Sequence, residues 1–450
     1  MDSANQSERY SLRDASGFAV MLGCAEAYFS AFAVYLNAST MQLGILATVP
    51  VFIGNLFHVA GVWLSDRLKY RRKPIALGAL IHACTLLPIA AIALFQPESG
   101  RIVFFFTCLL GFYMIQGLIV PSWNAWIGDI IDPGRRAVFF ARRTRRVSLW
   151  TFVSTLTAGT ILSYWQSRGL ESAGFTIIFL IAASARAFSS YSLSKHDDPE
   201  YHCDHSERFS FVDFIRRSGK SNFVRFAFFY GSVNFGVAFA SPYFAPYMLR
   251  DLSMSYGYFT AVIGAGVISQ VIALIYWANL SNKLGNKRIL EICGYGVSLV
   301  PVLWFVSPAL WYLLIIQIFS GLVWSGFNLA AQNFLFEAVS PQKRARCSAY
   351  LMVINGSCVL SGSLLGGFVS KHLPTATTLL PGPTGTSVLL WIFLISGVIR
   401  FLAIRVFLHK FKEVREVETA SLYSVMLRPA YIRAVEGFRF GVLPFGKKEQ

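Results

Sequence analysis

Long apolar stretches, separated by short clusters of charged residues, run through the whole chain. Of its 450 residues 55% are hydrophobic and only 14% are charged, whereas about a quarter of the residues are charged in a typical soluble protein. The apolar stretches are about 20 residues long, the length that an α-helix needs to cross a bilayer. Their residues do not alternate with period two, as they would in the strands of a membrane barrel. The sequence therefore predicts an all-α, polytopic membrane protein.

We expect twelve transmembrane helices, arranged as two bundles of six. The predicted spans are about 15–36, 42–64, 75–95, 102–127, 147–167, 174–194, 223–249, 257–279, 288–307, 309–331, 347–370 and 386–408. The predicted regions are an N-terminal six-helix bundle over 1–194, a cytoplasmic linker with an amphipathic segment over 195–222, a C-terminal six-helix bundle over 223–408, and a cytoplasmic tail over 409–450.

The Lys and Arg residues outside the predicted spans lie almost entirely on one side of them. The N-terminus, 65–74, 132–146, 195–225, 280–289, 340–347 and the tail hold 33 Lys and Arg residues, whereas the segments on the other side hold four. Because cytoplasmic loops collect Lys and Arg, both termini and the central segment are expected in the cytoplasm. The net charge of +17 has the same explanation, which argues against a nucleic-acid partner.

Two charged motifs recur in the second half of the chain. LSDRLKYRRK at 64–73 resembles LSNKLGNKR at 280–288, and GDIIDPGRR at 128–136 resembles FEAVSPQKR at 336–344. In the second pair an acid, a proline and an arginine recur at the same spacing: Asp129, Pro133 and Arg136, then Glu337, Pro341 and Arg344. The offsets are 216 and 208 residues. Two matching pairs at nearly one offset indicate a duplicated six-span unit, as many secondary transporters have.

These features resemble the major facilitator superfamily of secondary transporters, and the resemblance covers nearly the whole chain. The family signature between the second and third helices is G-x-L-a-D-R-x-G-R-K, which is matched here by the run from Leu64 to Arg67. Val62 and Lys69 stand in place of its two glycines. The segment 121–146 is also similar to one in poorly characterised bacterial members of the superfamily.

The resemblance implies two six-helix bundles around a central cavity that opens to each side in turn. It places Asp66 against the start of the eleventh helix, where the helix terminus and Arg346 could receive it. Such pairs would hold the cytoplasmic side shut and separate when the protein opens inward. The candidate latch residues are Asp66, Arg67, Lys73, Asp129, Arg136, Asn282, Lys283, Glu337, Arg344 and Arg346. The alternative is that the cations only fix the topology.

Glu26 is an acid near the middle of the first predicted span, about 16 Å from either end at 1.5 Å per residue. A charge at that depth is costly, so the side chain should face the interior and be able to take up a proton. Spacings of three and four place it on one small and polar face: Ala19, Gly23, Glu26, Ser30, Ala33 and Asn37. We interpret Glu26 as a proton-coupling or substrate-binding acid; the alternative is a buried acid tied to a neighbouring helix.

Polar residues of the first, fourth, seventh and tenth helices are the candidates for substrate contact, because the family resemblance makes these helices line the cavity. The candidates are Tyr113, Gln116, Asn124, Tyr230, Asn234, Gln317, Trp324 and Asn328. Gln116 and Gly117 match the motif R-x-x-Q-G of many proton-coupled members, with Tyr113 in place of the arginine. Amides and aromatic faces suit a polar organic solute such as a sugar. The alternative is that the aromatic residues only pack between helices.

The sequence indicates no cofactor, no metal site and no enzyme. It contains no Walker loop for ATP, so transport should be secondary, and no set of Ser, His and Asp stands out at matching depth. In the central segment His196, His202, Cys203 and His205 lie close together, but their spacing matches no zinc pattern.

The sequence therefore predicts a secondary transporter that works by alternating access in the plasma membrane or a bacterial inner membrane. We expect a monomer whose partners are a small polar organic solute, protons and the lipid bilayer. A drug or metabolite exporter is the first alternative. A non-transporting membrane receptor or scaffold with the same fold is the second, and a receptor would tolerate the loss of Asp66.

Overall fold

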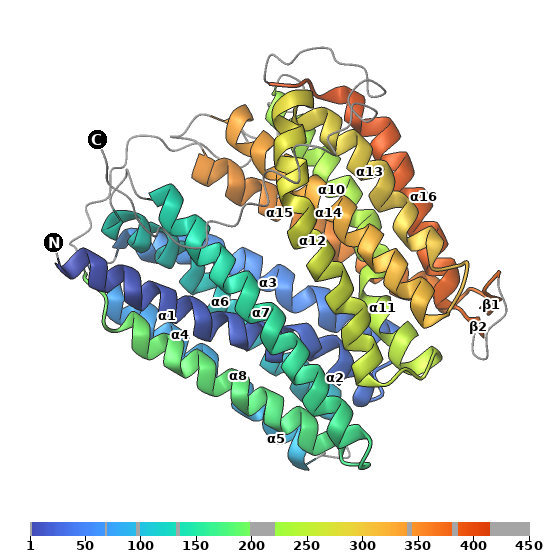
Figure 1. The fold of residues 1–450 in the computed structure, drawn as a ribbon, viewed down its shortest axis with the longest axis horizontal. Helices are drawn as coiled ribbons and strands as arrows, with labels where there is room; N and C mark the ends of the chain where they lie inside the picture. The colour runs from blue at the N-terminus through green and yellow to red at the C-terminus, as the bar shows by residue number, and fades with distance from the viewer. Residues whose placement is uncertain are drawn as a thin grey trace, which may run out of the picture.

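The structure is a computed structural model, which describes residues 2–67, 70–95, 100–131, 136–198, 221–339, 344–379 and 386–414. Nearly all of these residues are helical, because a helix satisfies its own backbone N–H and C=O groups where a bilayer offers no water. The described helices form twelve rods, six in each half of the chain (Figure 1). The predicted all-α fold with two six-helix bundles is confirmed.

The first half contains six rods, of which two are interrupted. The first rod consists of α1 (Asp2–Cys24), the 3₁₀ turn η1 (Glu26–Tyr28) and α2 (Phe29–Tyr35), and the third consists of α4 (Arg72–Cys84) and α5 (Leu86–Phe95). The continuous rods are α3 (Thr40–Arg67), α6 (Arg101–Ile130), α7 (Arg136–Gln166) and α8 (Glu171–Leu193).

The second half repeats this arrangement. Its first rod consists of α10 (Asn222–Ala240), the 3₁₀ turn η3 (Ser241–Tyr243), α11 (Phe244–Pro246) and the π-helical turn η4 (Tyr247–Asp251). The other rods are α12 (Tyr256–Leu284), α13 (Asn286–Leu303), α14 (Leu310–Ala338), α15 (Arg344–Val369) and α16 (Leu389–Phe407), which continues as η6 (Leu408–Lys410). The short strands β1 (Ala376–Thr377) and β2 (Thr386–Ser387) pair between α15 and α16.

Ten of the described helical segments are long and apolar enough to cross a membrane by length and composition alone. The two rods outside that set are α7 and α13. The later part of α7 is rich in Ser and Thr, and the 18 residues of α13 include Lys287, Arg288 and Glu291. Both rods nevertheless pack inside their bundles, α7 against α1 and α8, and α13 against α14 and α16. Contacts with neighbouring rods therefore hold α7 and α13 in their bundles, although these two rods are less apolar than the others.

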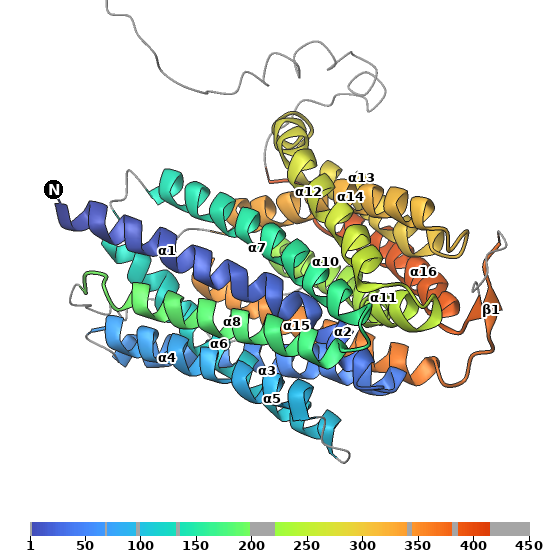
Figure 2. The same cartoon turned by 60° about the horizontal axis from the view of Figure 1, so that its bottom comes forward.

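The two halves meet at one end of the rods, through α3 against α15 and α7 against α12. Near the start of α3 the carbonyl oxygen of Gly44 accepts a hydrogen bond of 3.1 Å from Ser363 Oγ. At the end of α7 Gln166 Oε1 accepts one of 3.1 Å from the backbone N–H of Tyr256. We call this the closed end. Toward the end where α1 begins, the halves spread apart (Figures 1 and 2), and we call that the open end.

In each half, the residues that follow the sixth rod are hydrogen-bonded to the start of the third rod at the open end. In the first half Asp198 Oδ1 accepts hydrogen bonds from the backbone N–H groups of Arg71 and Arg72, at 2.9 and 3.1 Å. In the second half Glu413 Oε2 accepts one of 2.6 Å from the backbone N–H of Lys287. A carboxylate thus lies at the start of α4 and of α13, where helical N–H groups lack partners. Asp198 and Glu413 are 215 residues apart, as are Arg72 and Lys287.

The same segments also bind the first rod of their own half. Ser7 Oγ donates to Asp197 Oδ2 at 2.9 Å and accepts from the Asp197 backbone N–H at 3.2 Å. Asn222 Nδ2 donates to the Lys412 carbonyl at 2.8 Å, and Asn222 Oδ1 accepts from the Lys412 N–H at 2.7 Å. These pairs are again 215 residues apart. The internal repeat seen in two loop motifs therefore includes the residues after the sixth rod.

A buried charge cluster ties together four rods of the first half. Asp14 of α1 is 2% exposed, and its carboxylate lies 3.1 Å from Arg143 Nη2 of α7 and 3.8 Å from Arg186 Nη1 of α8. Ser189 Oγ donates to the same carboxylate at 2.7 Å. Arg186 Nε in turn donates to His82 Nδ1 of α4 at 3.2 Å. The stability of this bundle therefore depends on one buried acid that pairs with the buried Arg186 and the partly buried Arg143.

Replacing Asp14 with Asn should lower the free energy of unfolding by about 3–5 kcal/mol, because it leaves Arg186 charged and buried without its acid. The matched control is Glu291→Gln, which breaks the half-exposed pair with Arg288 and should cost about 0–1 kcal/mol. Thermal unfolding of the detergent-purified variants measures both changes. Equal losses for the two variants would contradict this account of the cluster.

His196, which follows α8, gives a second, pH-dependent prediction. Its ring is 1% exposed and lies 5.1 Å from the Trp126 ring, and burial lowers the pKa of His196 to about 4. An unfolded chain binds this proton near pH 6.5, so the free energy of unfolding should fall as the pH drops from about 6.5 to 4. Thermal unfolding across that range should show a smaller loss in His196→Phe, which keeps a ring but cannot titrate. An unchanged pH dependence would mean that other groups cause it.

Candidate functional site

The first rod of each half is broken in its middle. In the first half the α-helix stops at Ala25 and continues as the 3₁₀ turn η1, which begins at Glu26. In the second half α10 gives way to η3, where Pro242 removes a backbone donor. Irregular backbone inside a membrane is tolerated where it is buried in protein or lines a cavity, and binding sites of transporters are often built on such breaks. A binding site is therefore expected near the two breaks.

The carboxylate of Glu26 has one bonded oxygen and one oxygen without a hydrogen-bond partner. The hydroxyl of Tyr113, on α6, donates to Glu26 Oε1 over a long distance of 3.4 Å. Glu26 Oε2 is buried, and no hydrogen bond reaches it from the described residues. An unpaired buried carboxylate oxygen is costly. This oxygen is therefore suited to bind a proton or a hydrogen-bond donor of a substrate.

Close packing of α6 against α3 sets the position of Tyr113. A side chain at Gly54 of α3 would clash with the backbone of Tyr113, and one at Gly117 of α6 would clash with the carbonyl of Gly54. Such contacts between small residues bring membrane helices together. Gln116 is half-buried and Asn124 is exposed on the same helix. Of these three candidates on α6, Tyr113 is the one that the described residues show hydrogen-bonded to Glu26.

The other predicted residues gather in the second half, where a cavity of about 330 Å³ opens between α12 and α14. Three of the predicted residues, Gln317, Trp324 and Asn328, line it. The remaining lining residues are Ile263, Gly266, Val267, Gln270, Ser320 and Gly321. Gln270 was not among the predicted residues, although an amide in the apolar run GVISQVIALIYW is a signal that could have identified it. Two glutamines, an asparagine and a tryptophan can bind a polar molecule with a flat face.

The two candidates from the seventh rod lie beside this cavity rather than in its lining. Tyr230 is stacked on Phe327 of α14, with ring centroids 6.2 Å apart, and Phe327 in turn contacts Trp324 edge to face at 5.7 Å. The side chain of Asn234 donates to the Tyr230 carbonyl at 2.8 Å, within its own helix. Tyr230 therefore supports Trp324 through Phe327.

Only part of the predicted latch can be placed. Glu337 Oε2 accepts a hydrogen bond of 2.8 Å from Asn286 Nδ2, so this acid bonds within its own half. Lys73 and Lys283 are exposed at the open end. The side chains of the other seven lie outside the described ones: Asp66, Arg67, Asp129, Arg136, Asn282, Arg344 and Arg346.

A second cavity, of about 420 Å³, lies at the closed end between the two halves. Its lining includes Gln166 and Glu171 from the first half, and Arg250 and Tyr256 from the second. Tyr256 also bridges the halves, because its hydroxyl donates to Glu171 Oε2 at 3.4 Å. This cavity is separate from the one between α12 and α14.

The described residues contain no group of three or more His, Cys, Asp or Glu side chains that could hold a metal ion. Of the histidines and the cysteine noted in the central segment, only His196 is described. Residues His202, Cys203 and His205 lie outside the described part of the chain.

Comparison with known sequences finds one matching family profile and a similar bacterial protein. The sequence profile described as Major Facilitator Superfamily matches residues 226–432. The chain is 23% identical over 301 residues to multidrug resistance protein 2 of Bacillus subtilis (strain 168), a match that covers 66% of this chain and 70% of that protein.

Comparison with solved structures shows the same fold. A variant of the nucleoside transporter NupG matches with a TM-score of 0.66 and 15% identity, over 91% of this chain and 100% of that one. A bacterial homologue of the iron transporter ferroportin, in its inward-facing state, matches with a TM-score of 0.64 and 14% identity, over 90% and 98% of the two chains. At these identities the likeness concerns the fold alone.

Asn328 and Ser325 test whether the cavity between α12 and α14 is open to water. Asn328 is exposed and lines the cavity, whereas Ser325, one turn earlier on α14, is 1% exposed. In a background without the seven native cysteines, Asn328→Cys should react rapidly with a hydrophilic maleimide and Ser325→Cys should not. Labelling rates read by mass spectrometry give the comparison. Labelling of Asn328→Cys as slow as that of Ser325→Cys would place the cavity out of reach of water.

Proposed function

Since this chain belongs to the major facilitator superfamily and is a membrane transporter rather than an enzyme, we propose that it moves a small polar organic solute by alternating access, with Glu26 as the proton-coupling acid. The site would consist of Glu26 and Tyr113 in the first half and the α12–α14 cavity in the second. Solute and proton would then bind to opposite halves, and both would be released when the halves change their relative tilt.

The observation that carries the coupling role is the unpartnered oxygen of Glu26. Glu26 Oε2 is buried without a hydrogen-bond donor among the described residues, and no cation is within salt-bridge distance of this carboxylate in that part of the chain. A lone carboxylate inside a membrane protein is far more stable when protonated. Binding and release of a proton at Glu26 would therefore change the energy of the surrounding helices, which is what coupling requires.

The chemistry of the α12–α14 cavity supports an uncharged polar substrate. Its polar lining consists of amides and a hydroxyl, from Gln270, Gln317, Ser320 and Asn328, and Trp324 supplies an aromatic face. The lining contains no charged side chain. Amides both donate and accept hydrogen bonds, and the indole ring can stack on the flat side of a sugar or a heterocycle.

The spreading of the halves supports an inward-facing state in a plasma or bacterial inner membrane. The open end is the one where α1 begins and where the Lys-rich and Arg-rich segments lie, which the positive-inside rule assigns to the cytoplasm. The latch residues would then be separated in this state and would pair when the protein closes inward. A single chain contains both halves of the site, which is consistent with a working monomer.

Export is a second candidate direction of transport. It is favoured by the match to a protein described as a multidrug resistance protein. An exporter would use the same acid, but exchange an inward-moving proton for an outward-moving solute.

Reconstituted liposomes would test the function directly. The wild-type protein should accumulate one member of a mixed solute library only when a pH gradient is imposed, and Glu26→Gln should equilibrate that solute without accumulating it. The direction of the effective gradient separates symport from export. The matched control is Glu291→Gln, the same chemical change at a half-exposed position of α13, which should accumulate solute like the wild type.

Two outcomes would contradict the proposal. Equal accumulation by wild type and Glu26→Gln would make Glu26 a structural acid. Movement of no solute under either gradient, from protein that is folded by its thermal unfolding, would favour a receptor or scaffold with this fold.

A further inference from the structure

Two tyrosines occupy equivalent places in the breaks of the first and seventh rods. Tyr28 ends η1 and Tyr243 ends η3, and the two residues are 215 positions apart in the sequence. Their exposed fractions are 1% and 0%. The function proposed above uses neither of them.

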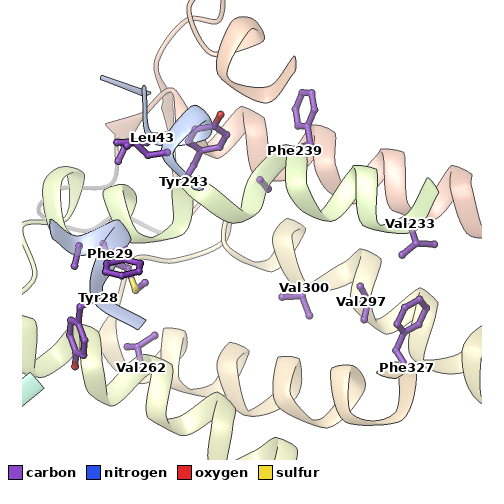
Figure 3. Close-up of a cluster of buried hydrophobic side chains, with 14 of the residues drawn as sticks. Tyr28, Phe29, Leu43, Val233, Phe239, Tyr243, Val262, Val297, Val300 and Phe327 are labelled. Atoms are coloured by element: carbon purple, nitrogen blue, oxygen red, sulfur yellow. The ribbon is translucent and has the colours of Figure 1, made fainter. Parts of the chain in front are cut away.

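The hydroxyl of Tyr28 connects the two halves at the crossing of α7 and α12. It donates to the Thr155 carbonyl of α7 at 2.7 Å and lies 2.8 Å from Thr260 Oγ1 of α12. Since the tyrosine proton goes to Thr155, the Thr260 hydroxyl is the donor in the second bond. Figure 3 shows Tyr28 beside Val262, which belongs to α12 like Thr260. Tyr28 thus belongs to the first half and is bonded directly to the second.

Tyr243 has the equivalent position at the crossing of α3 and α15. Its hydroxyl donates to the Ser363 carbonyl of α15 at 2.9 Å, and Ser363 Oγ donates across the halves to the Gly44 carbonyl of α3 at 3.1 Å. The tyrosine hydroxyl also packs on Gly44, where an added Cβ would be 2.6 Å from it. Figure 3 shows Tyr243 next to Leu43 of α3.

The partners of the two tyrosines are related by the same internal repeat. Thr155 and Ser363, whose carbonyls accept the two hydroxyl protons, are 208 residues apart. Gly44 and Thr260, which meet the two hydroxyls from the opposite half, are 216 residues apart. These are the offsets of the two repeated loop motifs. The two clusters are therefore copies of one arrangement rather than unrelated contacts.

We propose that Tyr28 and Tyr243 are positioning residues that seal the closed end, and that the stability of this seal sets the balance between the two states of the transporter. The proposal rests on the alternating-access function, because a seal at one end has a role only if the other end also closes. The Tyr28–Thr260 and Ser363–Gly44 bonds are buried and can form only while the halves touch. The bonds to the Thr155 and Ser363 carbonyls lie within one half and hold each tyrosine in place for that contact. Breaking both clusters is then part of the cost of opening the closed end.

The seal depends on glycines for its close approach. A side chain at Gly159 of α7 would overlap the Thr260 hydroxyl, and one at Gly44 would press on the Tyr243 hydroxyl. Gly159→Ala should therefore weaken the seal by steric pressure, through the same contacts that Tyr28→Phe weakens by removing a bond. Gly111→Ala is a matched control, because the nearest atom to its added Cβ would be 3.9 Å away.

Spin-label distances on purified protein give the test. In a background without native cysteines, one label pair at Phe95 and Trp311 reports the closed end, and a second pair at Ser194 and His409 reports the open end; all four side chains are exposed. Tyr28→Phe should shift the ratio of the two states by about 2- to 12-fold, which corresponds to one lost hydrogen bond. The closed-end distance should lengthen as the open-end distance shortens.

The remaining variants make the test specific. Tyr243→Phe should shift the ratio in the same direction, and the double variant should add the two shifts, because the clusters lie at different crossings. Tyr247→Phe is the control: Tyr247 is fully buried on the same rod, and its hydroxyl has no hydrogen-bond partner among the described residues. It should leave both distances unchanged. Thr260→Val provides a second way to remove the cross-half bond of Tyr28.

The proposal is overturned if Tyr28→Phe and Tyr243→Phe leave both distance distributions as in the wild type, or if they act in opposite directions. It is also overturned if they change only the unfolding temperature, since a purely structural role would do so without moving the ratio of states. These distances are recorded without solute or pH gradient. A failed liposome assay would therefore contradict the transport proposal and leave this result standing.

Discussion

A helix interrupted inside a bilayer leaves backbone groups that must find other partners, and this protein interrupts the first rod of both halves at equivalent places. The rest of the arrangement depends on these two breaks. The 3₁₀ turn of the first rod carries Glu26 at its start and Tyr28 at its end, so the candidate coupling acid and a contact between the halves are separated by a single residue. In the second half the turn carries Tyr243 in the same position. A change in the protonation of Glu26 could therefore move Tyr28, and with it the contact between the bundles, through two residues of backbone.

The two ends of the molecule differ in the interactions that can join the halves. At the closed end the halves meet through hydroxyl groups, carbonyls and glycines, and these contacts are short-ranged and demand a close fit. At the open end the sequence places clusters of Lys and Arg, whose interactions reach further but are screened by salt. An asymmetry of this kind means that ionic strength should act on one closed state far more than on the other.

The sequence predicted most of the architecture but only part of the candidate site. Hydrophobic periodicity and the distribution of Lys and Arg depend on local sequence, so the spans and their grouping could be predicted. Gln317, Trp324 and Asn328 line the α12–α14 cavity. They could be predicted as candidates because amides and a tryptophan in an apolar helix are conspicuous, and the same signal is present at Gln270. Tyr28 and Thr260 gave no signal, since each is an ordinary residue whose role arises from how two helices from different halves cross. Asp14 was missed because the first span was expected to begin at about residue 15, whereas α1 begins at Asp2 and places that acid inside the bundle.

The carboxylates of Asp198 and Glu413 lead to a conclusion about ancestry. Each carboxylate accepts a backbone hydrogen bond at the start of the third rod of its own half, and neither bond crosses between the halves. The unit that was duplicated therefore ended beyond its sixth helix and already included the carboxylate that bonds to its third rod. A half-length ancestral chain of this design would have kept these hydrogen bonds without a second half, and two copies of it could have paired side by side before their genes were joined into one.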